Sequence, residues 1–125
     1  MNYLLDTHTL IWALENNPTL SNSARDAIID GNNMIFVSPV SAWEISIKQA
    51  TGNLIAPNNL HEEIKLHDFT ELKINFEHAQ LAGTLPEIHK DPFDRMLIAQ
   101  AFLEKLTLIT RDKQIALYDI NYLTA

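Results

Sequence analysis

The sequence contains no cysteine, so it can form neither a disulfide bond nor a thiolate-bound metal site. It also lacks an apolar run of the roughly 20 residues that a membrane-spanning helix requires. Residues 1–6 show no basic stretch followed by a long apolar segment, which a secretory signal peptide would need. These absences predict a cytoplasmic protein without a membrane anchor.

Positive charge is scarce, because 9 lysines and arginines stand against 16 aspartates and glutamates, giving a net charge of −7. A module that holds nucleic acid through phosphate contacts alone is usually basic. The charge balance therefore disfavours a simple DNA- or RNA-binding module. It is compatible with an enzyme whose positive charge arrives as a bound metal ion.

The chain has the length and composition of one globular domain, residues 1–125, with 46% hydrophobic and 20% charged residues. Short apolar runs predict strands at 3–5, 34–37 and 106–109, and weaker patterns predict strands at 69–74 and 120–123. Apolar periodicity and capping residues predict helices between them, at 7–14, 21–30, 39–50, 59–67, 75–85 and 91–104, with a short helix after 112. This alternation predicts an α/β fold with a mostly parallel sheet covered on both faces.

Four acidic residues are predicted to lie at one edge of that sheet. Asp6 and Asp112 follow predicted strands, Glu44 lies in the helix after the second strand, and Asp94 lies near the start of the apolar helix. Ligands of open parallel sheets bind at the carboxyl ends of the strands. We therefore expect these four carboxylates to lie close together.

Each acid also has a structural interpretation. Asp6 and Asp112 could cap helices, and Asp94 could be a first-turn acid favoured by the helix dipole after an Asp91 cap. Glu44 could form an ordinary i,i+4 pair with Lys48. A capping box between Ser41 and Glu44 is disfavoured, because Pro39 fits the first helical position and makes Ser38 the cap.

Helical geometry favours the functional interpretation for two of the acids. Asp94 shares a helix face with Ile98 and Ala101, which should meet the sheet and direct the carboxylate inward. Glu44 lies in the second turn of its helix and flanks an apolar stripe: Val40, Trp43, Ile47 and Ala50.

Clustered carboxylates repel one another, and an oxygen-only acidic cluster is the environment that Mg²⁺ or Mn²⁺ prefers. Such ions polarise phosphoryl oxygens and lower the pKa of a bound water. Phosphodiester hydrolysis is the reaction that this predicted site favours.

Four segments, in this order, resemble the signature blocks of PIN domains, and most closely the VapC-like toxin branch: residues 5–14 (LDTHTLIWAL), 41–48 (SAWEISIK), 89–101 (HKDPFDRMLIAQA) and 108–112 (LITRD). Each block alone is a weak signal, whereas the ordered set is specific and spans nearly the whole chain.

The resemblance implies a three-layer α/β/α fold whose acidic pocket holds Mg²⁺ or Mn²⁺ and cleaves single-stranded RNA. Matched by position, Asp6, Glu44, Asp94 and Asp112 correspond to the family's catalytic, metal-binding acids. Thr7 and Thr110 match hydroxyl positions beside them. The resemblance also implies a homodimer and a small antitoxin protein that holds the toxin inactive.

Basic residues close to the four acids in sequence, including Lys48 and Arg95, could guide an RNA backbone or form salt bridges. The five histidines show no metal-ligand spacing, because Lys65 replaces the second histidine of an H-E-x-x-H motif that begins at His61. We therefore expect the histidines, His89 among them, to be solvated or to lie at the edge of the core.

Three alternatives compete with a nuclease. A haloacid-dehalogenase-like phosphatase needs a second aspartate two residues after the first, where His8 stands instead. A response-regulator receiver needs adjacent acids after the first strand and a phosphorylatable aspartate after the third, and no aspartate lies between Lys48 and His67. A PIN fold used only for binding or regulation stays open.

Overall fold

The computed structural model describes all residues, 1–125, and its centre is a parallel sheet. The strand order is β3-β2-β1-β4-β5, and every neighbouring pair runs parallel. The strands are β1 (Asn2–Leu5), β2 (Met34–Val37), β3 (Thr70–Glu71), β4 (Thr107–Thr110) and β5 (Tyr122–Thr124). The predicted parallel sheet is confirmed, and β1 occupies its centre.

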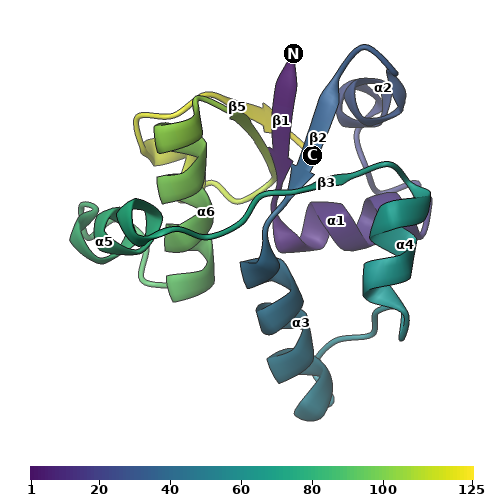
Figure 1. Cartoon of the computed structure of the whole chain (residues 1–125), viewed down its shortest axis with the longest axis horizontal. Coiled ribbons are helices and arrows are strands. Elements are labelled where there is room, and N and C mark those ends of the chain that lie inside the picture. The colour runs from purple at the N-terminus through teal and green to yellow at the C-terminus, as the bar shows by residue number, and fades with distance from the viewer.

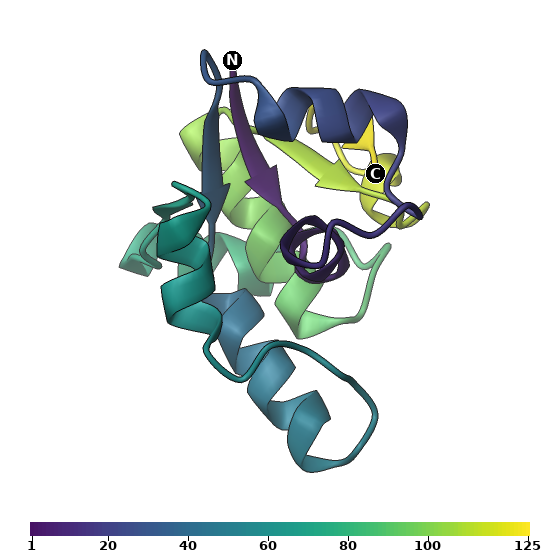
Figure 2. The same ribbon diagram turned by 90° about the vertical axis from the view of Figure 1, so that its right-hand side faces the viewer.

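Helices cover both faces of this sheet, as the two views in Figure 1 and Figure 2 show. They are α1 (Thr7–Leu14), α2 (Asn22–Ile29), α3 (Pro39–Ala50), α4 (Leu60–Leu66), α5 (Phe76–Thr84) and α6 (Pro92–Glu104), with a 3₁₀ helix η1 (Ile115–Leu117). Helices α1, α2 and α4 pack on one face, and α6, backed by α5, packs on the other. The predicted three-layer α/β/α fold is therefore confirmed, and no helix combines the length and apolar character needed to span a bilayer.

Two hydrophobic clusters lie on opposite faces of the sheet, because successive strand side chains alternate in direction. Leu5 and Ile109 belong to the cluster under α1 and α2, whereas Leu4 and Leu108 belong to the cluster under α6. All four side chains are fully buried. The continuous apolar runs of the central strands reflect this burial on both sides.

The predicted strand at 69–74 is shorter in the structure, where only Thr70–Glu71 pairs with β2. The N–H of Leu72 still donates to the carbonyl of Val37, but β2 ends there because Ser38 caps α3, so β3 has no strand partner further along. The carbonyl of Leu72 accepts a hydrogen bond from the side chain of Gln100 on α6.

The apolar stripe of α3 does not mark the covered side of that helix. Trp43 is 61% exposed and Ile47 is 41% exposed, whereas Ser41, Glu44 and Ile45 are buried. Helix α3 extends beyond the carboxyl end of the sheet and contacts α1 and α6, so only one side of it is covered (Figure 1). That side carries Glu44 toward the other acids.

Candidate active site

A pocket of about 310 Å³ lies at the carboxyl end of the sheet, and the side chains of all four predicted acids line it. Asp6 follows β1, Asp112 follows β4, Glu44 lies in the second turn of α3, and Asp94 lies in the first turn of α6. The structure therefore brings together residues from four elements that are far apart in sequence. Their predicted role in metal binding stays a prediction.

Asp6 both caps a helix and faces the pocket. Its side chain accepts a hydrogen bond from the backbone N–H of Thr9 at 2.8 Å, so the predicted capping role is real. Leu5 pairs with Ile109 in the sheet, which places Asp6 beside Thr110. Burial raises the pKa of Asp6, although hydrogen bonds with Thr110 and Thr9 act in the opposite direction.

Glu44 is only 3% exposed, and two neighbours hold its carboxylate. The Thr7 hydroxyl donates to Oε1 at 2.5 Å, and the Lys48 ammonium donates to Oε2. The hydrogen bond with Glu44 is the main reason that the pKa of Lys48 is raised. The i,i+4 pair that sequence offered as an alternative is therefore present, but on a glutamate that also lines the pocket.

Asp94 is a second acid of the site whose pKa is raised. Burial, followed by the negative charges of Asp91, Asp6 and Glu44, raises its pKa to about 7, while a hydrogen bond with His89 opposes the shift. Asp91 itself accepts hydrogen bonds from the N–H groups of Phe93 and Asp94, which confirms it as the cap of α6. Asp94 is thus a carboxylate whose negative charge its surroundings disfavour.

His89 is the site residue that sequence reasoning missed. Its side chain is not solvated: the residue is 8% exposed, and Nε2 lies 2.8 Å from Asp94 Oδ2 and 3.2 Å from Asp112 Oδ2. The sequence offered one signal, because His89 begins the 89–101 block, two residues before the Asp91 cap. Motif spacing could not reveal the contact, since its partners lie 5 and 23 residues away.

The predicted substrate-positioning residues separate into two groups. Thr7 and Lys48 line the pocket, and Thr110 is a buried neighbour of Asp6 whose hydroxyl accepts from the Asp112 N–H at 3.1 Å. Arg95 does not line the pocket: its guanidinium donates to the carbonyls of Ala82, Leu85, Pro86 and His89. The positioning role predicted for Arg95 is corrected to one of fixing the 85–91 loop.

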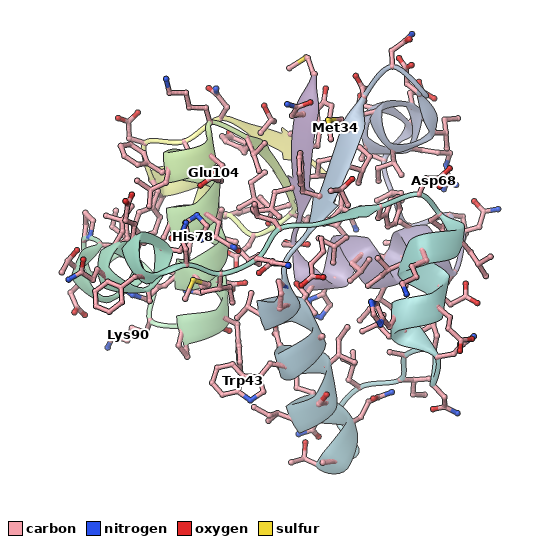
Figure 3. All side chains as sticks on the ribbon, viewed as in Figure 1. Met34, Trp43, Asp68, His78, Lys90 and Glu104 are labelled. Carbon is pink, nitrogen blue, oxygen red and sulfur yellow. The ribbon has the colours of Figure 1, made fainter.

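Two other basic side chains close to the acids in sequence, Arg111 and Lys90, differ in their surroundings. Arg111 reaches the pocket, but its guanidinium donates to the carbonyls of Thr19 and Ala125 and lies 4.6 Å over the ring of Trp12. Lys90 is exposed and projects outward from the loop before α6 (Figure 3). Lys48 is therefore the only lysine that lines the acidic pocket.

The donor set fits a hard divalent cation. Five carboxylates, one ammonium and one guanidinium line the same pocket, and the ligand atoms of His89, Asp94 and Asp112 lie within 4.8 Å of one another. Burial raises the pKa of both Asp6 and Asp94, and for Asp94 the negative charges of Asp91, Asp6 and Glu44 add to the effect. A bound Mg²⁺ or Mn²⁺ ion would supply compensating positive charge, with oxygen ligands of the kind these ions prefer.

The fold and the pocket define a class: a three-layer α/β/α protein with a carboxylate-lined site at the carboxyl end of its parallel strands. The PIN domain family model matches residues 3–121, and the chain therefore belongs to the PIN domain family. No curated protein sequence is similar enough to this chain to count as a match.

Several solved structures share this fold. VapBC2 from Rickettsia felis, bound to a DNA fragment from its promoter, has a TM-score of 0.70 at 17% identity, covering 98% of each chain. A toxin–antitoxin complex from Klebsiella pneumoniae has a TM-score of 0.65 at 19% identity over 98% of this chain and 96% of that one. FitAcB from Neisseria gonorrhoeae has a TM-score of 0.62 at 19% identity over the same shares.

Proposed function

We propose that this protein is a metal-dependent endoribonuclease that uses Mg²⁺ or Mn²⁺ to hydrolyse phosphodiester bonds of single-stranded RNA. The observation that carries the proposal is the convergence of Asp6, Glu44, Asp94 and Asp112 on one pocket. Membership of the PIN domain family supports nuclease activity. It disfavours the two other classes considered from the sequence, a phosphatase and a response-regulator receiver.

In this proposal the four acids hold the metal, and the ion supplies Lewis-acid activation of water and of the scissile phosphate. The residues of the chain supply position and charge. Thr7 fixes one oxygen of Glu44, leaving the carboxylate in a single orientation, and Lys48 neutralises part of the pocket's negative charge. Thr110 and Thr9 hold Asp6 at the end of β1.

We further propose that the protein is the toxin of a toxin–antitoxin pair, acting in the cytoplasm as a homodimer. Two observations support protein partners. The first is that the similar folds include a toxin–antitoxin complex. The second is that α3 exposes the apolar side chains of Trp43 (labelled in Figure 3) and Ile47. The ring centroids of Trp43 and Phe93 lie 5.1 Å apart in an edge-on arrangement. Exposed apolar surface of this kind is typical of contact sites. An antitoxin would inhibit effectively by placing a basic side chain in the acidic pocket.

The activity is tested by incubating purified protein with single-stranded RNA, with EDTA and after restoring Mg²⁺ or Mn²⁺. We expect cleavage that stops in EDTA and returns with metal. An Asp94→Asn protein purified in the same way controls for contaminating nuclease. Undiminished cleavage in EDTA would contradict the metal mechanism, and no cleavage under any condition would favour a PIN fold used only for binding.

The partner is tested separately by expressing the chain with the genes that flank it and purifying it by a tag. We expect a small protein to co-purify in fixed stoichiometry and to suppress cleavage. Recovery of the chain alone from its native operon would argue against an antitoxin. Mapping the RNAs cut after induced expression would identify the target.

A further inference from the structure

We propose that His89 is a nitrogen ligand of the same metal centre and that it makes the site favour Mn²⁺ over Mg²⁺. This inference rests on the metal-dependent nuclease proposed above. It assigns a role to His89, a buried side chain that lines the pocket beside the four acids.

The position of His89 is fixed through its backbone on both sides. Its N–H donates to the Tyr118 hydroxyl at 2.8 Å, and its carbonyl accepts from Arg95 Nη1 at 3.0 Å. The Tyr118 hydroxyl in turn donates to the carbonyl of Pro86 at 2.7 Å, which ties the start of the same loop to its end. A residue held in this way presents its ring to the pocket in a defined orientation, as a metal ligand must.

The distances agree with neighbouring positions in one coordination shell. Ligand atoms about 2.1 Å from an octahedral ion are about 3.0 Å apart when they occupy adjacent positions. The separations from His89 Nε2 to Asp94 Oδ2 and Asp112 Oδ2 are 2.8 and 3.2 Å, on either side of that value. One ion could therefore bind among these three atoms with little movement of their side chains.

An ordinary ion pair would have the same distances, but it would affect metal binding in the opposite direction. A protonated His89 that merely compensates Asp94 and Asp112 competes with the metal, so removing it would tighten metal binding. A coordinating His89 contributes to affinity, so removing it would weaken metal binding. The sign of the change separates the two roles.

The type of donor atom determines which metal ion the site binds more tightly. An imidazole nitrogen is a softer donor than a carboxylate oxygen and favours transition-series ions over Mg²⁺. Mn²⁺ belongs to that series and also accepts the octahedral, oxygen-rich surroundings that the remaining ligands offer. A mixed site of one nitrogen and several carboxylates is therefore better matched to Mn²⁺.

The test is calorimetric titration of the full chain with MnCl₂ and, separately, with MgCl₂, in the absence of RNA. We compare wild type, His89→Gln, which replaces the nitrogen donor with an amide, and His67→Gln, an exposed histidine outside the pocket. We expect His89→Gln to weaken Mn²⁺ binding by about tenfold or more and Mg²⁺ binding by much less. His67→Gln should bind both ions as the wild type does.

Tighter or unchanged Mn²⁺ binding by His89→Gln would overturn the role of His89 while leaving the carboxylate site intact. Absence of binding of either ion by the wild type would instead overturn the metal centre itself. Pulsed EPR of the Mn²⁺-loaded wild type gives a direct check, since a coordinated imidazole should produce nitrogen modulation that His89→Gln lacks. Wild-type spectra without that modulation would also refute the assignment.

Discussion

At the scale of single residues, the raised pKa of Asp94 has a measurable consequence for stability. An unfolded aspartate has a pKa near 3.8, and the folded value is about 7, so the folded state retains this proton over a wider pH range. The stability contributed by the neutral carboxyl group is complete below the lower pKa and is lost as the pH rises through the higher one. Asp94→Asn removes that loss while keeping the shape of the side chain.

We therefore expect metal-free Asp94→Asn to melt higher than metal-free wild type, with a gap that widens from pH 5 to pH 8 and reaches a few degrees. Thermal melts in EDTA at several pH values measure it. If Asp94 is only a first-turn acid, the substitution removes a favourable dipole interaction of roughly 0.3–1 kcal/mol, and the variant melts lower at neutral pH.

Thr7 offers a second test, because its hydroxyl is the buried donor to Glu44 and lies 3.1 Å from the Ser41 hydroxyl. Thr7→Val keeps the volume but leaves a buried carboxylate oxygen without its donor. We expect a loss of about 1–3 kcal/mol in the free energy of unfolding, measured by urea titration. Thr7→Ser keeps the hydroxyl and should lose clearly less; equal losses would show that the methyl group, not the hydrogen bond, matters.

Sequence reasoning identified the four acids because their placement follows from local rules. Asp6, Glu44 and Asp112 lie just after a strand or within the first two turns of the helix that follows it, and parallel strands bring such positions to one edge. Asp94 lies in α6, which follows α5, and was placed instead by the helix face that it shares with Ile98 and Ala101. His89 and Arg95 could not be assigned in this way. Their roles depend on the path of a loop and on which atoms of that loop face the protein, and neither is encoded in spacing along the chain.

At the scale of elements, the segment between α5 and α6 is held by Arg95. Its guanidinium donates to four carbonyls, one at the end of α5 and three in the following loop. Lysine keeps the charge but lacks the planar fork that satisfies several acceptors at once. The loop carrying His89 should therefore depend on the guanidinium and not simply on a positive charge.

We expect Arg95→Lys to destabilise the protein by about 1–3 kcal/mol and to accelerate amide exchange in the 85–91 loop more than elsewhere. Hydrogen exchange measured by mass spectrometry tests this. Arg25→Lys is the matched control, since Arg25 donates to Asn16 and Asn17 on the opposite face of the sheet and touches no part of the loop. Uniform acceleration of exchange across the chain, or no acceleration, would refute the role of Arg95 in holding the 85–91 loop.

The helices and strands themselves were largely predictable, because apolar runs and caps mark them. Ser38 with Pro39 begins α3, Asn75 begins α5 and Asp91 begins α6, as the sequence indicates. Two features depend on distant parts of the chain: β3 is short because its partner β2 ends at Val37, and the position of α3 beyond the sheet exposes Trp43. Both depend on tertiary contacts that periodicity does not report.

At the scale of the whole molecule, a protein with a net charge of −7 gathers carboxylates where its parallel strands end. Such an arrangement is unfavourable unless a cation completes it, and the repulsion contributes, after burial, to the raised pKa of Asp94. The fold therefore gathers acidic side chains in one pocket, where we propose that a metal ion binds.

The most direct test of this account compares two aspartates three residues apart at the start of α6. Asp94 is assigned to the metal, whereas Asp91 lines the pocket but serves as the helix cap, a role that asparagine fills equally well. The measurement is the single-turnover rate of RNA cleavage at saturating Mn²⁺ for wild type, Asp94→Asn and Asp91→Asn. We predict a loss of about a hundredfold or more for Asp94→Asn and a rate within a few-fold of wild type for Asp91→Asn. Near-wild-type cleavage by Asp94→Asn would contradict the assignment of Asp94 to the metal centre.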